Sequence, residues 1–194
     1  MQQNALNGMK DEGSCSITQL QALRACQDIK FDVTEKKIRD AVKYVEKCYH
    51  KTSGGFLYSL SNQMVGISGG EPSFAVSAAM LSSLNAAGDY HSPLEPQALA
   101  FLHKLLDKGA DEATFHAYGH FYAAQAFYQA GEEQWRYYWS KAHPKILKLQ
   151  KSDGSFQGQG NWGMDEQYGG MLLDSAFYLL VLQGPNQYLP MFQR

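Results

Sequence analysis

The sequence predicts an all-α protein built from helical hairpins, and three observations support this fold class. Apolar residues recur with the roughly 3.6-residue period of helices, and no long stretch alternates apolar and polar residues as a strand does. In addition, uncharged helical segments alternate with charged, amphipathic ones along the chain. An uncharged helix is expected to be buried all round, whereas an amphipathic helix is half exposed. We therefore expect an inner layer of buried helices wrapped by an outer layer of amphipathic helices.

The predicted inner helices carry very little charge. They cover residues 16–29, 74–87, 117–130 and 168–182. The first fits the pattern least well, because Arg24 and Asp28 interrupt it. The last contains one charged residue, Asp174. A charge in an otherwise apolar helix must be paired, neutralised or functional. Asp174 is therefore either paired with another side chain for a structural purpose or part of a functional site.

The predicted outer helices show an apolar stripe among Lys, Arg and Glu. They cover residues 34–49, 93–107 and 134–150. The second opens with Ser92-Pro93-Leu94-Glu95, which has the pattern of a capping box with Pro at the first helical position. Pro144 lies inside the third and is expected to kink or restart it.

Length and composition narrow the function classes. A chain of 194 residues predicts one domain, with residues 1–13 as an N-terminal tail and 14–194 as a single repeat domain. The net charge of −2 gives no electrostatic reason to expect nucleic acid. Three cysteines without CxxC spacing predict neither a disulfide framework nor a zinc knuckle. The chain has no signal-peptide pattern and no apolar run of 18 or more residues, which predicts a soluble protein. The sequence does not distinguish a cytoplasmic from a periplasmic location.

Two segments share a turn pattern. LKLQKSDGSF (147–156) ends a helix, turns through Asp153-Gly154 and then places Phe156, and KTSGGFLYS (51–59) repeats the Gly-aromatic turn. Gly supplies the left-handed conformation after a helix, Asp caps the turn, and the aromatic ring can seal the hairpin. This pattern is typical of structural contacts and not of a catalytic site.

These turns resemble the QW-type motif of the prenyltransferase and squalene-cyclase repeat superfamily. Residues 118–135 and 168–194 are also similar to inner-helix and C-terminal segments of bacterial, notably planctomycete, prenyltransferase/squalene-oxidase repeat proteins. The resemblance covers the chain from about residue 14 onward and implies an α/α toroid of helical hairpins. Toroids of this superfamily usually contain more hairpins than this sequence predicts. We therefore expect a partial or small ring, whose exposed apolar edges imply a partner or a homo-oligomer.

The resemblance also implies catalytic motifs that the sequence does not contain intact. Squalene cyclases use an Asp-rich DxDD motif, and no Asp-x-Asp occurs here. Protein prenyltransferases bind zinc through Asp-x-Cys and a His. The comparable positions read Glu71-Pro72-Ser73, so a hydroxyl replaces the thiolate ligand. We predict no cofactor and no zinc, and leave enzymatic activity open.

Glu71 is a weak metal candidate, and so are His116 and His120. Their four-residue spacing places both on one helix face, where they could bind a metal. The alternative is that they line the polar mouth of a pocket. The candidate catalytic residues are Asp165, Glu166, Asp174, His116 and His120, most of them at the starts of inner helices. The candidate pocket residues are Phe74, Tyr118, Tyr122, Trp162 and Tyr168.

The leading functional hypothesis is a repeat domain that binds a hydrophobic, isoprenoid-like ligand or a protein segment in an inner-ring pocket. One alternative is an enzyme that acts on an isoprenoid or similar apolar substrate with non-standard acids. A second alternative is a carbohydrate-active α/α barrel, which would need two carboxylates facing each other across a groove.

Overall fold

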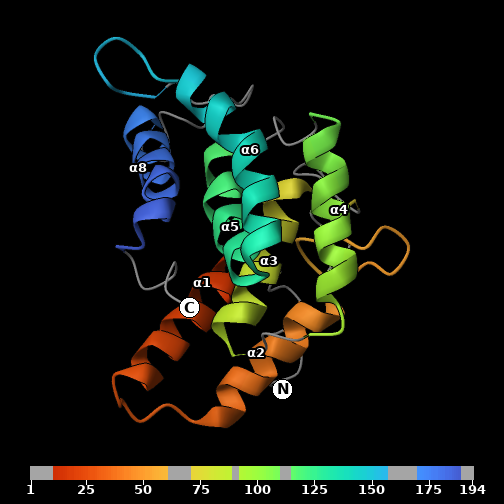
Figure 1. The fold of residues 1–194 in the computed structure, drawn as a ribbon. Coiled ribbons are helices and arrows are strands. Elements are labelled where there is room, and N and C mark those ends of the chain that lie inside the picture. The colour runs from red at the N-terminus through yellow and green to blue at the C-terminus, as the bar shows by residue number, and fades with distance from the viewer. Residues whose placement is uncertain (1–10, 61–70, 89–91, 110–114, 157–169, 189–194) are drawn as a thin grey trace.

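The computed structural model describes residues 11–60, 71–88, 92–109, 115–156 and 170–188. Within these ranges the chain is all-α, as predicted, and its only β-pairings are two isolated bridges. The helices are α1 (Gly13–Asp28), α2 (Glu35–Lys47), α3 (Phe74–Ala86), α4 (Glu95–Asp107), α5 (His116–Gln129), α6 (Glu132–Lys148) and α8 (Gly170–Leu182), followed by a short 3₁₀ turn, η2 (Gly184–Asn186) (Figure 1).

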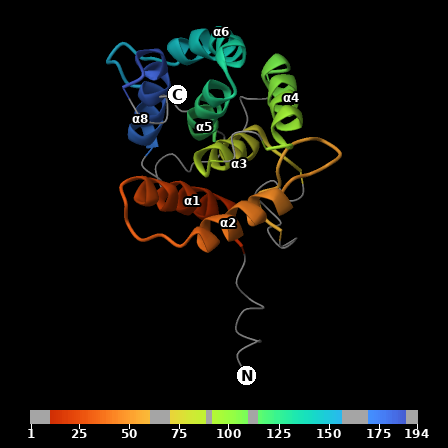
Figure 2. The same ribbon diagram turned by 60° about the horizontal axis from the view of Figure 1, so that its bottom comes forward.

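The four helices predicted to be inner ones pack in a row. α3 lies against both α1 and α5, and α5 lies against α8 (Figures 1 and 2). Each predicted outer helix packs on the inner helix before it: α2 on α1, α4 on α3 and α6 on α5. The ends of the row, α1 and α8, do not pack extensively on each other. Closure into a toroid therefore remains a prediction.

Burial follows the charge pattern for most helices. α3 and α5 are buried over almost their whole length, as their lack of charge predicts. The outer helices α2 and α6 expose charged faces that carry pairs four residues apart, such as Lys36–Asp40 and Arg136–Glu132. α8 departs from the prediction of complete burial, because no described element covers its face opposite α5. Leu172 on that face is 84% exposed.

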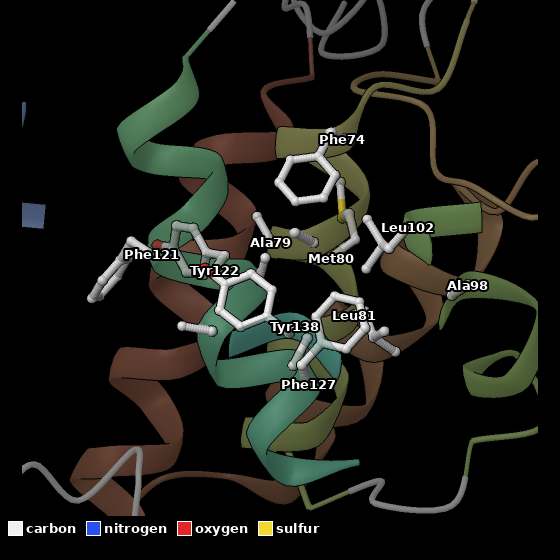
Figure 3. Close-up of a cluster of buried hydrophobic side chains, with 14 of the residues drawn as sticks. Phe74, Ala79, Met80, Leu81, Ala98, Leu102, Phe121, Tyr122, Phe127 and Tyr138 are labelled. Atoms are coloured by element: carbon white, nitrogen blue, oxygen red, sulfur yellow. The ribbon is translucent and has the colours of Figure 1, made fainter. Parts of the chain in front are cut away.

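The core lies where α3, α4, α5 and α6 meet (Figure 3). Phe127 and Tyr138 stack with ring centroids 5.2 Å apart, and Leu102 of α4 is fully buried. α3 and α5 approach closely at Gly119, where an added Cβ would lie 3.1 Å from Cα of Ala75. The α3–α5 interface is therefore closely packed, and a larger residue at Gly119 would require its neighbours to shift.

One outer helix starts later than predicted, and another is not interrupted at its proline. α4 begins at Glu95 and not at Pro93, because Ser92 forms a turn: its hydroxyl accepts from the Leu94 N–H and its carbonyl from the Glu95 N–H. Ser92 therefore lies before the helix and is not its N-cap, and Pro96 occupies the first turn of the helix. α6 continues through Pro144 as one helix to Lys148.

The two predicted turns have the same construction. In each, a residue at the helix end forms an isolated β-bridge to the aromatic residue: Tyr49 to Phe56, and Gln150 to Phe156. Gly54 and Gly154 adopt φ values of +85° and +86°, the left-handed conformation that glycine adopts without strain. The structural role predicted for these turns agrees with this geometry.

Both turns are fastened to the next inner helix by a serine. Phe56 and Phe156 are fully buried, and their N–H groups donate to Ser77 Oγ of α3 at 2.9 Å and Ser175 Oγ of α8 at 3.0 Å. Asp153 accepts from the Ser155 N–H, as the predicted turn cap requires. Each turn thus joins the end of an outer helix to the following inner helix.

Candidate functional site

Four of the predicted site residues lie outside the described ranges: Asp165, Glu166, Trp162 and Tyr168. Of the other seven, Phe74 and Glu71 lie apart, and the remaining five fall into three places. Tyr118 and Tyr122 belong to an aromatic cluster on α5, His116 and His120 to a buried group between α5, α6 and α8, and Asp174 to α8. Each place offers a different chemistry.

The aromatic cluster consists of Tyr118, Phe121, Tyr122 and Phe177. Tyr118 and Tyr122 make an edge contact with centroids 4.7 Å apart, and Phe121 lies 4.9 Å from Phe177 of α8. Tyr118 also meets Phe177 edge-on at 6.2 Å. The sequence analysis did not select Phe121 or Phe177. The sequence spacing could have indicated Phe121, because it lies three residues after Tyr118 and so nearly on the same helix face.

Both phenols of the cluster stay protonated well into the alkaline range. Burial raises the pKa of Tyr118, and the neighbouring Tyr122 and Tyr58 raise it further. Burial also raises the pKa of Tyr122, although its hydrogen bond with Tyr118 acts in the opposite direction. Neutral phenols can donate and accept hydrogen bonds but are poor general bases at neutral pH. The cluster is therefore suited to contact with an apolar group.

Phe74 does not belong to this cluster. Its side chain is buried in the core (Figure 3). Its ring centroid lies 5.3 Å from that of His120. Glu71, the weak metal candidate, is exposed just before α3. Ser73 caps α3 by accepting from the Val76 N–H at 3.3 Å. The serine thus has a structural role at this position.

His116 and His120 share one face of α5, as their spacing predicts, and their ring centroids are 4.3 Å apart. Both are buried. His116 Nδ1 hydrogen-bonds Tyr178 Oη of α8 at 2.6 Å, and His120 Nδ1 hydrogen-bonds Tyr138 Oη of α6 at 3.0 Å. Over the described ranges, no set of three or more His, Cys, Asp or Glu side chains is placed to hold a metal ion. The two histidines join α5 to α6 and to α8.

A second cluster of polar side chains, around Asp11 and Glu12, holds the start of α1 in place. Asp11 accepts from Tyr44 Oη at 2.8 Å, from Ser59 Oγ at 2.6 Å and from the Leu60 N–H at 2.7 Å. Next to it, Glu12 accepts from Tyr58 Oη at 2.5 Å. These two carboxylates connect the segment before α1 to α2 and to residues 58–60. Residues 11–13, assigned to the tail from sequence, are thus bonded to the folded domain.

The exposed face of α8 consists of Leu172, Leu173, Ala176 and Leu179. The three leucines are 84%, 42% and 48% exposed, and Ala176 is also exposed. At about 100° per residue, Leu172, Ala176 and Leu179 form one stripe along the helix. Tyr178 and Val181 lie on the opposite side and are buried. Asp174 is half-buried and lies away from this stripe.

α8 is nevertheless too short to be a membrane span. Among the described residues, no helix is both long enough and apolar enough to cross a bilayer. The leucines of α8 therefore form a surface feature of a 13-residue helix.

The chain was also compared with known proteins. Neither protein-family models, nor curated proteins, nor solved structures give a match to it. A function for the chain must therefore be argued from its geometry.

Proposed function

We propose that this protein is a helical-repeat binding domain that binds an apolar protein segment on the exposed face of α8. The observation that carries the proposal is the absence of charge from that face: its four exposed side chains are all apolar. Single exposed leucines are common and need no explanation. A contiguous group on one helix, in contrast, is typical of a surface that is covered by a partner.

The energetics favour a helical partner. Burying a leucine side chain that is fully exposed contributes about 1.5–3 kcal/mol. Leu172 is 84% exposed, whereas Leu173 and Leu179 are 42% and 48% exposed and would contribute about half as much each. A neighbouring amphipathic helix with apolar residues at positions i, i+4 and i+7 would cover the same length of α8. Its backbone hydrogen bonds would already be satisfied internally, so no polar backbone group would be buried without a partner.

The geometry of the other candidate residues supports binding over catalysis. The phenols of the aromatic cluster remain neutral at neutral pH, because burial raises their pKa values. His116 and His120 use Nδ1 to bond tyrosines of neighbouring helices. These contacts give each of the four side chains a structural role.

The test is binding of a fluorescent synthetic helix with leucines at i, i+4 and i+7, followed by anisotropy. We expect saturable binding to the wild-type protein. The double variant Leu172→Glu/Leu179→Glu should weaken it at least about tenfold, the equivalent of 1.4 kcal/mol. The matched control is Ala100→Glu/Ser140→Glu, which adds the same charge at exposed positions of α4 and α6. Equal affinity of both variants would contradict the proposal.

A second candidate is binding of an isoprenoid-like ligand, and the aromatic cluster favours it. Tyr118 and Phe177 are only half-buried, so their rings are partly accessible. In the same experiment, quenching of tryptophan and tyrosine fluorescence by an isoprenoid alcohol, lost in Tyr118→Ala but kept in Leu172→Glu/Leu179→Glu, would support this candidate. Turnover of an isoprenoid diphosphate by the purified protein would contradict a pure binding role.

A further inference from the structure

We propose that the segment bound on the exposed face of α8 is α8 of a second copy of this chain, related by two-fold symmetry. This inference rests on the proposed function, because it names the partner of the same surface. The two helices would run antiparallel, with their stripes of Leu172, Ala176 and Leu179 in contact.

The position of α8 in the fold determines which kind of helix fits beside it. His116 of α5 bonds Tyr178 on the buried side of α8, and Phe121 of α5 contacts Phe177. The exposed stripe lies on the side of α8 away from these contacts. α8 itself is at the end of the row α1–α3–α5–α8 (Figure 2). The next position in such a row would be occupied by another apolar helix. α8 of a second copy is such an apolar helix, and its own apolar face is also exposed.

The stripe is complementary to itself. It alternates large, small and large side chains along the helix: Leu172, Ala176 and Leu179. In an antiparallel pair with the two-fold axis near Ala176, each Leu172 faces Leu179 of the second copy. The small Ala176 side chains at the axis let the two backbones approach, as small residues do at close helix crossings.

Charge favours this symmetric contact over the other helices. In a two-fold interface a charged side chain near the axis meets its own copy, so like charges repel. The exposed face of α8 has no charged residue. The exposed faces of α2 and α6, in contrast, carry ion-paired side chains such as Lys36 and Arg136. Of these three helices, α8 alone can pair with itself without burying charge.

A head-to-tail contact of α8 with α1 is the main alternative arrangement. α1 is the other end of the row and exposes Thr18, Gln19 and Ala22. Its C-terminal half also carries the Arg24–Asp28 ion pair. Covering α8 with this more polar surface would bury less apolar area, and repetition of the contact would produce rings or open chains. The symmetric α8 pair avoids both consequences.

The size of the contact sets the expected affinity. A helix of 13 residues is about 20 Å long. Contact along one such helix is smaller than the roughly 1,200 Å² that stable interfaces bury. We therefore expect a reversible dimer with a dissociation constant in the micromolar range, which a concentration series can detect.

The first test is sedimentation velocity of the full chain over a range of concentrations. We expect a shift from monomer to dimer in the wild-type protein. Leu172→Glu/Leu179→Glu should raise the dissociation constant at least about tenfold, because it places four carboxylates in the contact. Ala100→Glu/Ser140→Glu should leave the dissociation constant unchanged. Weakening by Ala22→Glu on α1 would support the head-to-tail contact and overturn the symmetric one.

The second test is disulfide trapping, which reports the register of the two helices. Cys15 is exposed and is first replaced by serine, while the half-buried Cys26 and the buried Cys48 are retained. In this background Ala176→Cys should form a disulfide-linked dimer, because the two copies meet at the axis. Leu172→Cys alone should form little, whereas Leu172→Cys/Leu179→Cys should form it readily.

The outcomes separate the partner from the proposed function. A monomer at all concentrations, together with no crosslink through Ala176→Cys, would overturn the second copy as partner. If the synthetic helix still binds such a monomer, the proposed function stands. If neither a second copy nor the helix binds, both proposals fail.

Discussion

Asn85 is the clearest case in which a single residue opposes the stability of the fold. It is buried on α3, and neither its amide nitrogen nor its amide oxygen has a hydrogen-bond partner in the described structure. A buried polar group without a partner costs about 1–3 kcal/mol. Ser82, one turn earlier, has partners in Gln125 of α5 and Gln21 of α1. Removing the polar group of Asn85 and removing that of Ser82 should therefore change the free energy of unfolding in opposite directions.

We expect Asn85→Leu to raise the free energy of unfolding by about 1 kcal/mol, because leucine has the same number and branching of heavy atoms and no unsatisfied amide. Ser82→Ala is the matched comparison and should lower the free energy of unfolding by about 1 kcal/mol. Urea denaturation followed by circular dichroism measures both. A destabilising Asn85→Leu would mean that the amide is satisfied by a bound group, and would contradict the expectation.

At the scale of elements, the two serine-fastened turns determine how the hairpins are joined. Phe56 and Phe156 are equally buried, and each N–H bonds a serine on the next inner helix. Phe56→Ala and Phe156→Ala should each lower the free energy of unfolding by about 3–5 kcal/mol, the usual cost of removing a buried ring. Thermal and urea unfolding provide the measurement.

The control for these turns is Phe115→Ala. Phe115 precedes α5 and is 44% exposed, so its loss should change the free energy of unfolding by less than about 1 kcal/mol. A large effect at one turn but not at the other would show that the two are not equivalent. In that case the repeat interpretation of the sequence would be wrong.

The helices and turns could be predicted because their signals are local. Periodicity and charge placed all seven described helices, and the Gly-aromatic pattern located both turns. The start of α4 was predicted two residues early, because Ser92 bonds its neighbours in a turn and does not cap the helix. Helix ends depend on such single hydrogen bonds, which sequence patterns do not distinguish.

The contacts of the candidate site depend on residues far apart in the chain, so the sequence indicated them only in part. The spacing of His116 and His120 predicted a shared face, but Tyr178, the partner of His116, lies 62 residues beyond it. The bonds of Asp11 to Ser59 and Leu60 were not predicted for the same reason. Exposed apolar edges were expected for a partial ring, but not that α8 would carry one, because periodicity does not say which helix lacks a neighbour.

At the scale of the whole molecule, the buried tyrosines make the free energy of unfolding fall at alkaline pH. Burial is the main cause that raises the pKa of five tyrosines above the ordinary value of 10.0: Tyr44, Tyr58, Tyr118, Tyr122 and Tyr137. For Tyr137 the pKa is raised to about 12. A raised pKa in the folded state means that the unfolded chain ionises first. The stabilisation is therefore fully present below pH 10 and is lost as pH rises through the folded-state pKa.

Replacing two of these phenols should flatten the alkaline loss of stability. In the wild-type protein, each phenol that ionises only in the unfolded state lowers the free energy of unfolding by about 1.4 kcal/mol per pH unit above pH 10. We expect Tyr118→Phe/Tyr122→Phe to give a shallower slope, measured by urea unfolding from pH 8 to about pH 11. Tyr188→Phe is the matched control, because Tyr188 is 74% exposed and its replacement should leave the slope unchanged. Equal slopes for both variants would mean that Tyr118 and Tyr122 ionise as readily in the folded protein as in the unfolded chain, and that the aromatic cluster is open to water.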